Sequence, residues 1–126
     1  MSGNPKFFLG TDSAPHPVVA KRGGADGKGK IAAGVFTQPY ATQYVLSAFE
    51  EGIEQGLISE SDVSEEKLAG FLNKYGSNFY EVHYEKGEKI VIEKGNEIVV
   101  ESVGDASKAE VVPFRRGKPI WSLKWV

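Results

Sequence analysis

The sequence predicts an α/β fold, and three observations lead to this prediction. A short apolar run, residues 7–9, stops at Gly10 and has the length and composition of a buried strand. Two stretches in the middle of the chain carry apolar residues at helical spacing. The last third contains short runs of β-branched residues, which favour strands. We therefore expect one strand first, then two helices, then a β-rich end.

Length and composition narrow the class of protein. The chain has 126 residues, of which 40% are apolar and 25% charged, as expected for one modest globular domain. Its formal net charge of -2 gives no electrostatic reason to expect a nucleic acid or an anionic membrane as partner. Because there is no cysteine, disulfides and cysteine-ligated zinc are excluded. No apolar run approaches the roughly 18 residues of a membrane span, and no signal-peptide core is present, so we expect a cytoplasmic protein.

The loop after the first predicted strand holds the strongest candidates for chemistry. Asp12 and His16 lie four residues apart, but Pro15 between them prevents a common helix and favours an extended Ala14. In parallel α/β proteins, the carboxyl end of a strand is where active sites lie. The alternative is that Asp12 caps a turn and His16 is an ordinary surface residue.

A glycine-rich stretch follows at residues 21–30 and predicts a long surface loop. Four glycines within residues 23–29 make regular structure unfavourable. Gly24 and the pair Gly29-Lys30 fit the first part of a phosphate-binding loop, but Ile31 stands where the motif needs a hydroxyl residue. No helix is predicted directly after it, so the pattern favours a surface loop over a nucleotide site.

Two amphipathic helices are expected next. The first should end at Gly56, and its apolar stripe consists of Ala41, Val45, Ala48, Phe49 and Ile53. The second should begin after Ser64 as N-cap and end at Gly76, with a stripe of Leu68, Phe71, Leu72 and Tyr75. Both stripes indicate core packing rather than a cofactor or partner site.

The β-rich end predicts a hairpin and a basic turn. The runs 90–92 and 98–100 are joined by Lys94-Gly95-Asn96, a hairpin signal. Residues 104–107 are expected to form a loop. Three cations, Arg115, Arg116 and Lys118, lie between short apolar segments and are expected to form a solvated turn. With loop 23–30 they suggest an alternative function, a small non-enzymatic module that binds a phosphorylated ligand.

The residues by themselves do not predict a complete catalytic site. Ser13 directly follows Asp12, which disfavours a serine triad, and no Gly-x-Ser-x-Gly motif is present. A catalytic zinc needs three protein ligands, and the candidates are Asp12, His16, His83 and scattered glutamates. His83 lies in a polar stretch and is expected at the surface.

A resemblance adds to this picture. The run FLGTDSAPH at residues 8–16 resembles the last barrel strand and following loop of dihydroorotases of the bacterial and fungal single-function type. Further segments resemble the same family in the same order, at residues 33–36, 40–42, 49–51, 78–80, 112–114 and 121–122. The resemblance implies the C-terminal segment of a (β/α)8 (TIM) barrel: the last strand plus two helices, followed by a β-hairpin and tail. Residues 1–80 would end the barrel domain, and residues 81–126 would form the hairpin and tail that pack on it.

The same resemblance implies a chemistry. Dihydroorotases of this type are zinc-dependent cyclic amidohydrolases of pyrimidine biosynthesis, which hold two zinc ions through four histidines, a carboxylated lysine and an aspartate. Asp12 would be that zinc ligand and the general base and acid. His16 would hydrogen-bond the small-molecule substrate, and Ala33 would contact it through its backbone. Because the other ligands have no counterpart here, we expect the isolated chain to be inactive and to need the remainder of the barrel or a homodimer partner.

Overall fold

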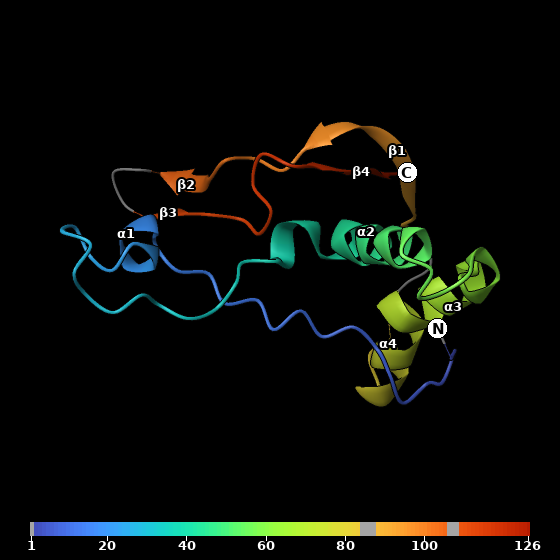
Figure 1. The fold of residues 1–126 in the computed structure, drawn as a ribbon. Helices are drawn as coiled ribbons and strands as arrows, with labels where there is room; N and C mark the ends of the chain where they lie inside the picture. Colours follow the sequence, from blue (N-terminus) through green and yellow to red (C-terminus); the bar gives the residue numbers. More distant parts are fainter. Residues whose placement is uncertain (1, 84–87, 106–108) are drawn as a thin grey trace.

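The computed structural model describes residues 2–83, 88–105 and 109–126. Its helical elements are α1 (Val18–Lys21), η1 (Gln38–Tyr40), α2 (Ala41–Glu54), η2 (Glu60–Asp62), α3 (Glu65–Ala69), η3 (Gly70–Lys74) and α4 (Tyr75–Phe79). Its strands are β1 (Ile90–Ile98), β2 (Val103–Asp105), β3 (Ala109–Val111) and β4 (Pro119–Trp125). The long β1–β4 ribbon runs alongside α2, and the N-terminal segment passes on the other side of that helix (Figure 1). The expected mixture of helices and strands is confirmed.

The strand expected at residues 7–9 is not formed. Leu9 donates its N–H to the Phe71 carbonyl at 2.9 Å and Phe7 donates to Asn4 at 3.1 Å, so these residues bond to helical and turn segments. No strand among the described residues pairs with them, and the Phe7 side chain is 66% exposed. A barrel strand takes its ladder bonds from two neighbours. Without those neighbours the apolar run has nothing to pair with, which explains why the prediction was wrong for this chain.

The first predicted helix is confirmed as α2. Gly56 adopts φ 70°. It donates its N–H to Ile53 at 2.9 Å, while Leu57 donates to Gly52 at 2.9 Å. This is the paired bonding of a Schellman end, for which a left-handed glycine is the usual residue. The end predicted at Gly56 is therefore confirmed together with its mechanism.

The second predicted helix begins as expected but does not end at Gly76. Ser64 caps α3 and accepts the Lys67 N–H. The helix then continues through the π-helical stretch η3 into α4, which ends at Phe79. A β-carbon at Gly76 would lie 3.1 Å from the Phe8 ring. The glycine thus permits close packing of the N-terminal segment, and the prediction of a stop was wrong.

The predicted hairpin between residues 90–92 and 98–100 is also wrong. Residues 90–92 and Ile98 belong to one strand, β1, which pairs antiparallel with β4 from Ile90↔Trp125 to Ile98↔Pro119, and Val99 and Val100 follow its end. The register shifts between Glu93 and Glu97, so the expected turn residues form a bulge instead. A separate two-stranded sheet joins β2 to β3, and it takes Gly104 and Asp105 out of the expected loop at 104–107. Residues 106–107 of that loop lie outside the described residues.

The core is small for a chain of this size. Among the described residues, only Tyr40, Val99 and Ile120 are buried apolar side chains, while sixteen large apolar side chains are exposed. The accessible surface is 9194 Å². A compact monomer of 13.7 kDa would expose about 6,600 Å². Within the described part of the chain, no helix has the length and apolar character needed to cross a membrane.

Candidate functional site

The Asp12 loop is held in place by hydrogen bonds on both sides of the carboxylate. Ser13 Oγ accepts the backbone N–H of Thr37 at 3.2 Å and of Gln38 at 3.1 Å. Thr37 Oγ1 donates to the Thr11 carbonyl at 3.2 Å. The two residues that flank Asp12 are therefore tethered to one segment, residues 37–38. The loop keeps a fixed shape although the strand before it is not formed.

Asp12 itself has an unusual backbone and a free side chain. Its φ is 44°, in the left-handed region that aspartate enters more readily than most residues. The side chain is exposed, and its carboxylate accepts no hydrogen bond from any described residue. The structure therefore gives no support to the alternative that Asp12 caps a turn. Strained backbones of this kind cluster at active sites and ligand clamps.

His16 and Ala33 are brought to neighbouring segments. Ala14 donates its N–H to the Val35 carbonyl at 2.9 Å, which joins residues 14–16 to residues 32–35. Gly34 has φ 106°, and a β-carbon there would lie 2.7 Å from Ala14 Cβ and 3.4 Å from His16 Nε2. Only a glycine permits this approach. The imidazole is half-buried, whereas Ala33 is exposed.

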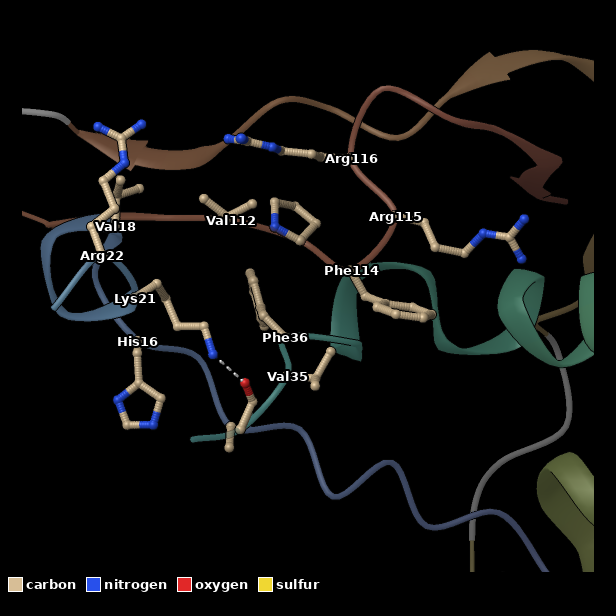
Figure 2. Close-up of a pocket in the computed structure, with 13 residues that line it drawn as sticks. His16, Val18, Lys21, Arg22, Val35, Phe36, Val112, Phe114, Arg115 and Arg116 are labelled. Atoms are coloured by element: carbon tan, nitrogen blue, oxygen red, sulfur yellow. Dashed lines mark hydrogen bonds between the residues drawn. The ribbon is translucent and has the colours of Figure 1, made fainter. Parts of the chain in front are cut away.

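A lysine that was not identified from the sequence holds the segment around Ala33 in place. Lys21, at the end of α1, donates from Nζ to the carbonyls of Ala32 and Gly34, both at 2.8 Å. Ala32 in turn donates its N–H to Ala20 at 3.1 Å. Figure 2 shows the Lys21 side chain reaching toward this segment beside His16. The helical turn α1 therefore holds residues 32–34 against the His16 segment.

A cavity of about 370 Å³ opens beside this arrangement. It is lined by His16, apolar side chains and four cations, which are Lys21, Arg22, Arg115 and Arg116, and none of its lining residues is acidic. Two of the cations are directed elsewhere. Arg115 pairs with Glu51 of α2 at 2.6 Å, and Arg116 Nε lies 3.8 Å from Glu101. Lys118, the third cation of the predicted basic turn, does not line the cavity.

One tyrosine next to the cavity has a shifted pKa. Tyr44 donates its hydroxyl to the carbonyl of Phe114, and its ring packs on that of Phe114 at 5.4 Å between centroids. Burial is the main cause that raises the pKa of Tyr44 to about 12, with a smaller contribution from Tyr40. The phenol stays neutral at any physiological pH and serves as a structural donor.

The glycine-rich loop closes on itself. Gly29 donates its N–H to Gly23 at 2.6 Å, and Gly27 donates to Gly24 at 3.3 Å. No helix follows within residues 28–35. A phosphate loop instead presents successive N–H groups at a helix start. The interpretation of residues 21–30 as a loop is confirmed, except that Lys21 belongs to α1.

The described residues do not assemble a metal site. No three side chains of histidine, cysteine, aspartate or glutamate come together among them. His83 is exposed, as expected. Asp12 can therefore supply one ligand at most, to a site that other residues would have to complete.

The sequence does contain one signal for the tethers of the Asp12 loop that we did not use. It is the Thr-x-Ser pair around Asp12, since such hydroxyls commonly bind nearby backbone.

Comparisons with known proteins point to one family. No family model matches the chain. It is 34% identical over 129 aligned positions to a dihydroorotase of Saccharomyces cerevisiae, which covers 99% of this chain and 32% of that protein. A probable dihydroorotase of Schizosaccharomyces pombe is 36% identical, with 98% of this chain and 32% of the relative covered. The chain thus spans about one third of the length of the curated relatives it matches.

Solved structures give the same result. The crystal structure of the Saccharomyces cerevisiae dihydroorotase in complex with 5-fluoroorotic acid matches with a TM-score of 0.73 and 34% identity, over 98% of this chain and 31% of that one. A Campylobacter jejuni dihydroorotase matches with a TM-score of 0.66 and 29% identity, over 98% and 31%. Both the sequence and the backbone of this chain are therefore similar to about one third of these longer dihydroorotases.

Proposed function

This chain is homologous to a segment of dihydroorotases, and from that premise we propose that it supplies the closing part of such an enzyme's barrel. Residues 1–80 are proposed to end the barrel domain and to carry the active-site loop. Residues 81–126 are proposed to be the β-rich tail that packs on it. One observation carries the proposal: the segment that resembles the family most, residues 8–16, is the segment whose backbone the structure tethers around an exposed Asp12.

The proposed reaction is the reversible cyclisation of N-carbamoyl-L-aspartate to L-dihydroorotate. The ureido nitrogen forms a bond to the carboxyl carbon and loses a proton, while the carbon loses one oxygen as water. A carboxylate within hydrogen-bond reach of both groups can carry that proton. We assign this role to Asp12, whose carboxylate is exposed and bound to no described residue. His16 and the Ala33 backbone are the proposed contacts to the negatively charged substrate.

We propose zinc binding only for a barrel that is completed by further residues. A catalytic zinc site needs at least three protein ligands, and the described residues bring no three candidates together. Asp12 would hold one position of such a site. Bound zinc polarises a carbonyl and lowers the pKa of its water. Since the described residues do not assemble a zinc site, we expect no turnover from the chain alone.

The large exposed surface of the chain favours a large binding partner. The chain exposes about 2,600 Å² more than a compact monomer of its mass would, whereas a standard interface buries about 800 Å² per partner. An apolar groove of about 910 Å³ lies between α2, α3 and the β1–β4 ribbon. Its apolar lining includes Leu46, Phe49, Ile53, Leu68, Leu72 and Trp121. We propose that the rest of the barrel covers this surface, rather than a second copy of the chain.

The test is an assay of the assembled enzyme. This chain is mixed with the separately produced part of the Saccharomyces cerevisiae relative that it does not match, zinc is added, and hydrolysis of dihydroorotate is followed in the ultraviolet. The mixture should turn over and the chain alone should not. Asp12→Asn should lower the rate by about 10²–10⁴-fold, the usual contribution of a general base. His16→Ala should raise KM more than it lowers zinc content.

Two results would contradict this proposal. Turnover by the 126-residue chain alone would refute the expected inactivity. An Asp12→Asn mixture with the full rate would refute the role of Asp12. Sedimentation of the chain alone as a stable dimer would favour the homodimer partner over the rest of the barrel.

A second candidate, a module that binds a phosphorylated ligand, is favoured by one observation. Four cations and no acidic residue line the cavity beside His16. The self-closed glycine loop and the absence of a hydroxyl at Ile31 do not favour a nucleotide. Titration with ATP and magnesium, followed by fluorescence of Trp121 and Trp125, tests it; saturable binding in the micromolar range would support this candidate.

A further inference from the structure

We propose that Lys21 is a positioning residue for the reaction, which aims the N–H of Ala33 at a carboxylate of the substrate. The proposal rests on the proposed function, because that function makes Ala33 a substrate contact. Lys21 itself would not touch the substrate. It would act through the backbone of residues 32–34.

The Lys21 ammonium binds two backbone carbonyls. Lys21 Nζ donates to Ala32 O and to Gly34 O, each at 2.8 Å, so it holds the carbonyls on both sides of Ala33. Both bonds are partly buried. Hydrogen bonds with an ionised donor are about twice as strong as neutral ones. The conformation of Ala33 is therefore fixed from both neighbours.

The geometry of the peptide unit sets the direction of the Ala33 N–H. It belongs to the same planar trans peptide as the Ala32 carbonyl, and the described chain has no cis peptide bond. In a trans unit the N–H points opposite to the C=O, so this N–H points away from Lys21. No acceptor among the described residues takes it, and Ala33 is exposed. It is a free donor.

The charge of Lys21 strengthens that donor. A positive charge on the carbonyl oxygen draws electron density toward it and polarises the rest of the peptide, which strengthens its N–H. The neighbouring segment carries His16, held close by the contact between Gly34 and Ala14. A polarised N–H beside an imidazole suits a carboxylate oxygen. Each carboxyl group of N-carbamoyl-L-aspartate, and the one retained in dihydroorotate, has that chemistry.

The bonds to the Ala32 and Gly34 carbonyls distinguish Lys21 from the other cations nearby. Arg22 lines the same cavity but donates to no carbonyl of residues 32–34. Lys28 lies on the loop that follows α1, is exposed, and its ammonium contacts no described residue. Lys28→Met is thus a matched control, because it removes the same charge from the neighbouring loop without removing a bond to residues 32–34.

The first experiment uses the chain by itself. Amide hydrogen exchange is measured by NMR at Ala32, which donates to Ala20, and at Ala14, which donates to Val35. Lys21→Met should accelerate exchange at Ala32 and Ala14 by at least about tenfold, the cost of a lost charge-assisted bond. Lys28→Met should stay within about twofold of the wild type, and Lys21→Arg should recover part of the protection. Equal exchange in Lys21→Met and Lys28→Met would overturn the proposal.

The second experiment separates a positioning role from a merely structural one. In the mixture with the complementary segment, Lys21→Met should raise KM by about tenfold and leave kcat within about threefold, while Lys21→Arg recovers KM. If the wild-type mixture turns over and Lys21→Met keeps the wild-type KM, the inference fails and the proposed function stands. If the wild-type mixture does not turn over, the proposed function fails, and the exchange measurement decides the grip of Lys21.

Discussion

Replacing Gly34 by alanine should open the contact between the two site segments. Gly34 has φ 106°, and holding a non-glycine residue in such a sparsely populated region costs about 1–3 kcal/mol. The new β-carbon would lie 2.7 Å from Ala14 Cβ and 2.9 Å from the Ala14 carbonyl, closer than real β-carbons come to other heavy atoms. Both costs act on the bond from Ala14 N–H to Val35 O. We expect the free energy of opening that bond to fall by at least about 1.4 kcal/mol, a tenfold change.

The measurement is hydrogen exchange at the Ala14 amide, and the chain offers two matched controls. At Gly10, φ is not positive and an added β-carbon meets no atom within 4 Å. At Gly56, φ is 70° and the space is again open, so alanine there adds backbone cost alone, at the end of α2. Neither Gly10→Ala nor Gly56→Ala should change exchange at Ala14. If Gly34→Ala leaves that exchange within twofold of the wild type, or if Gly10→Ala accelerates it equally, the argument from close contact is refuted.

Two further predictions concern the helices. Because burial raises the pKa of Tyr44 to about 12, the folded state favours its neutral phenol; that stabilisation is complete below the ordinary pKa near 10 and is lost as pH rises toward 12. An absorbance titration at 295 nm should therefore show a step near pH 12 that Tyr44→Phe abolishes, and a titration without such a step in the wild type would contradict the burial. Ser64→Ala removes the cap that accepts the Lys67 N–H and should destabilise α3 by about 1 kcal/mol, seen as weaker helical circular dichroism; an unchanged signal would show that packing alone fixes this helix start.

The helices were predictable because their signals are local. Gly56 ends α2 with the bonds that a left-handed glycine makes possible, and Ser64 caps α3 three residues from the N–H it accepts. Both signals act within one turn of helix, so the sequence contains all of the relevant chemistry. The stop expected at Gly76 failed for the opposite reason. The glycine at position 76 leaves room for the ring of Phe8, and Phe8 is far away in the sequence.

The strands were less predictable because their partners are distant. Lys94-Gly95-Asn96 has hairpin composition, yet β1 runs through it and pairs with β4 near the end of the chain. A β-carbon at Gly95 would collide with the Ser122 side chain, so the glycine serves this pairing instead of a turn. The apolar run at 7–9 needs neighbours that no described residue provides. Strand formation depends on pairing, and pairing is a tertiary property.

In the candidate site, too, some residues were identified from the sequence and others were not. Asp12, His16 and Ala33 were identified from a contiguous run and a short motif, and their roles stay predictions. The residues that hold them were not identified, because a lysine or a serine carries no local sign of the carbonyl or N–H it will meet. Ser13 was considered as a nucleophile, and it instead accepts two backbone N–H groups from residues 37–38.

The Asp12 loop keeps its hydrogen bonds to residues 37–38 although the strand before it is not formed. This observation suggests how a complete enzyme would assemble. The tethers from residues 11 and 13 to residues 37–38, and the grip of Lys21 on residues 32–34, all lie within the first 40 residues of this chain. The apolar groove that we propose the rest of the barrel covers is built from other elements, α2, α3 and the β1–β4 ribbon. If the proposal holds, affinity for the complementary segment and positioning of the carboxylate would therefore depend on different residues. Measured without zinc, an Asp12→Asn chain should bind that segment as tightly as the wild type, because the exposed carboxylate does not line the groove, whereas the mixture with zinc should lose its rate.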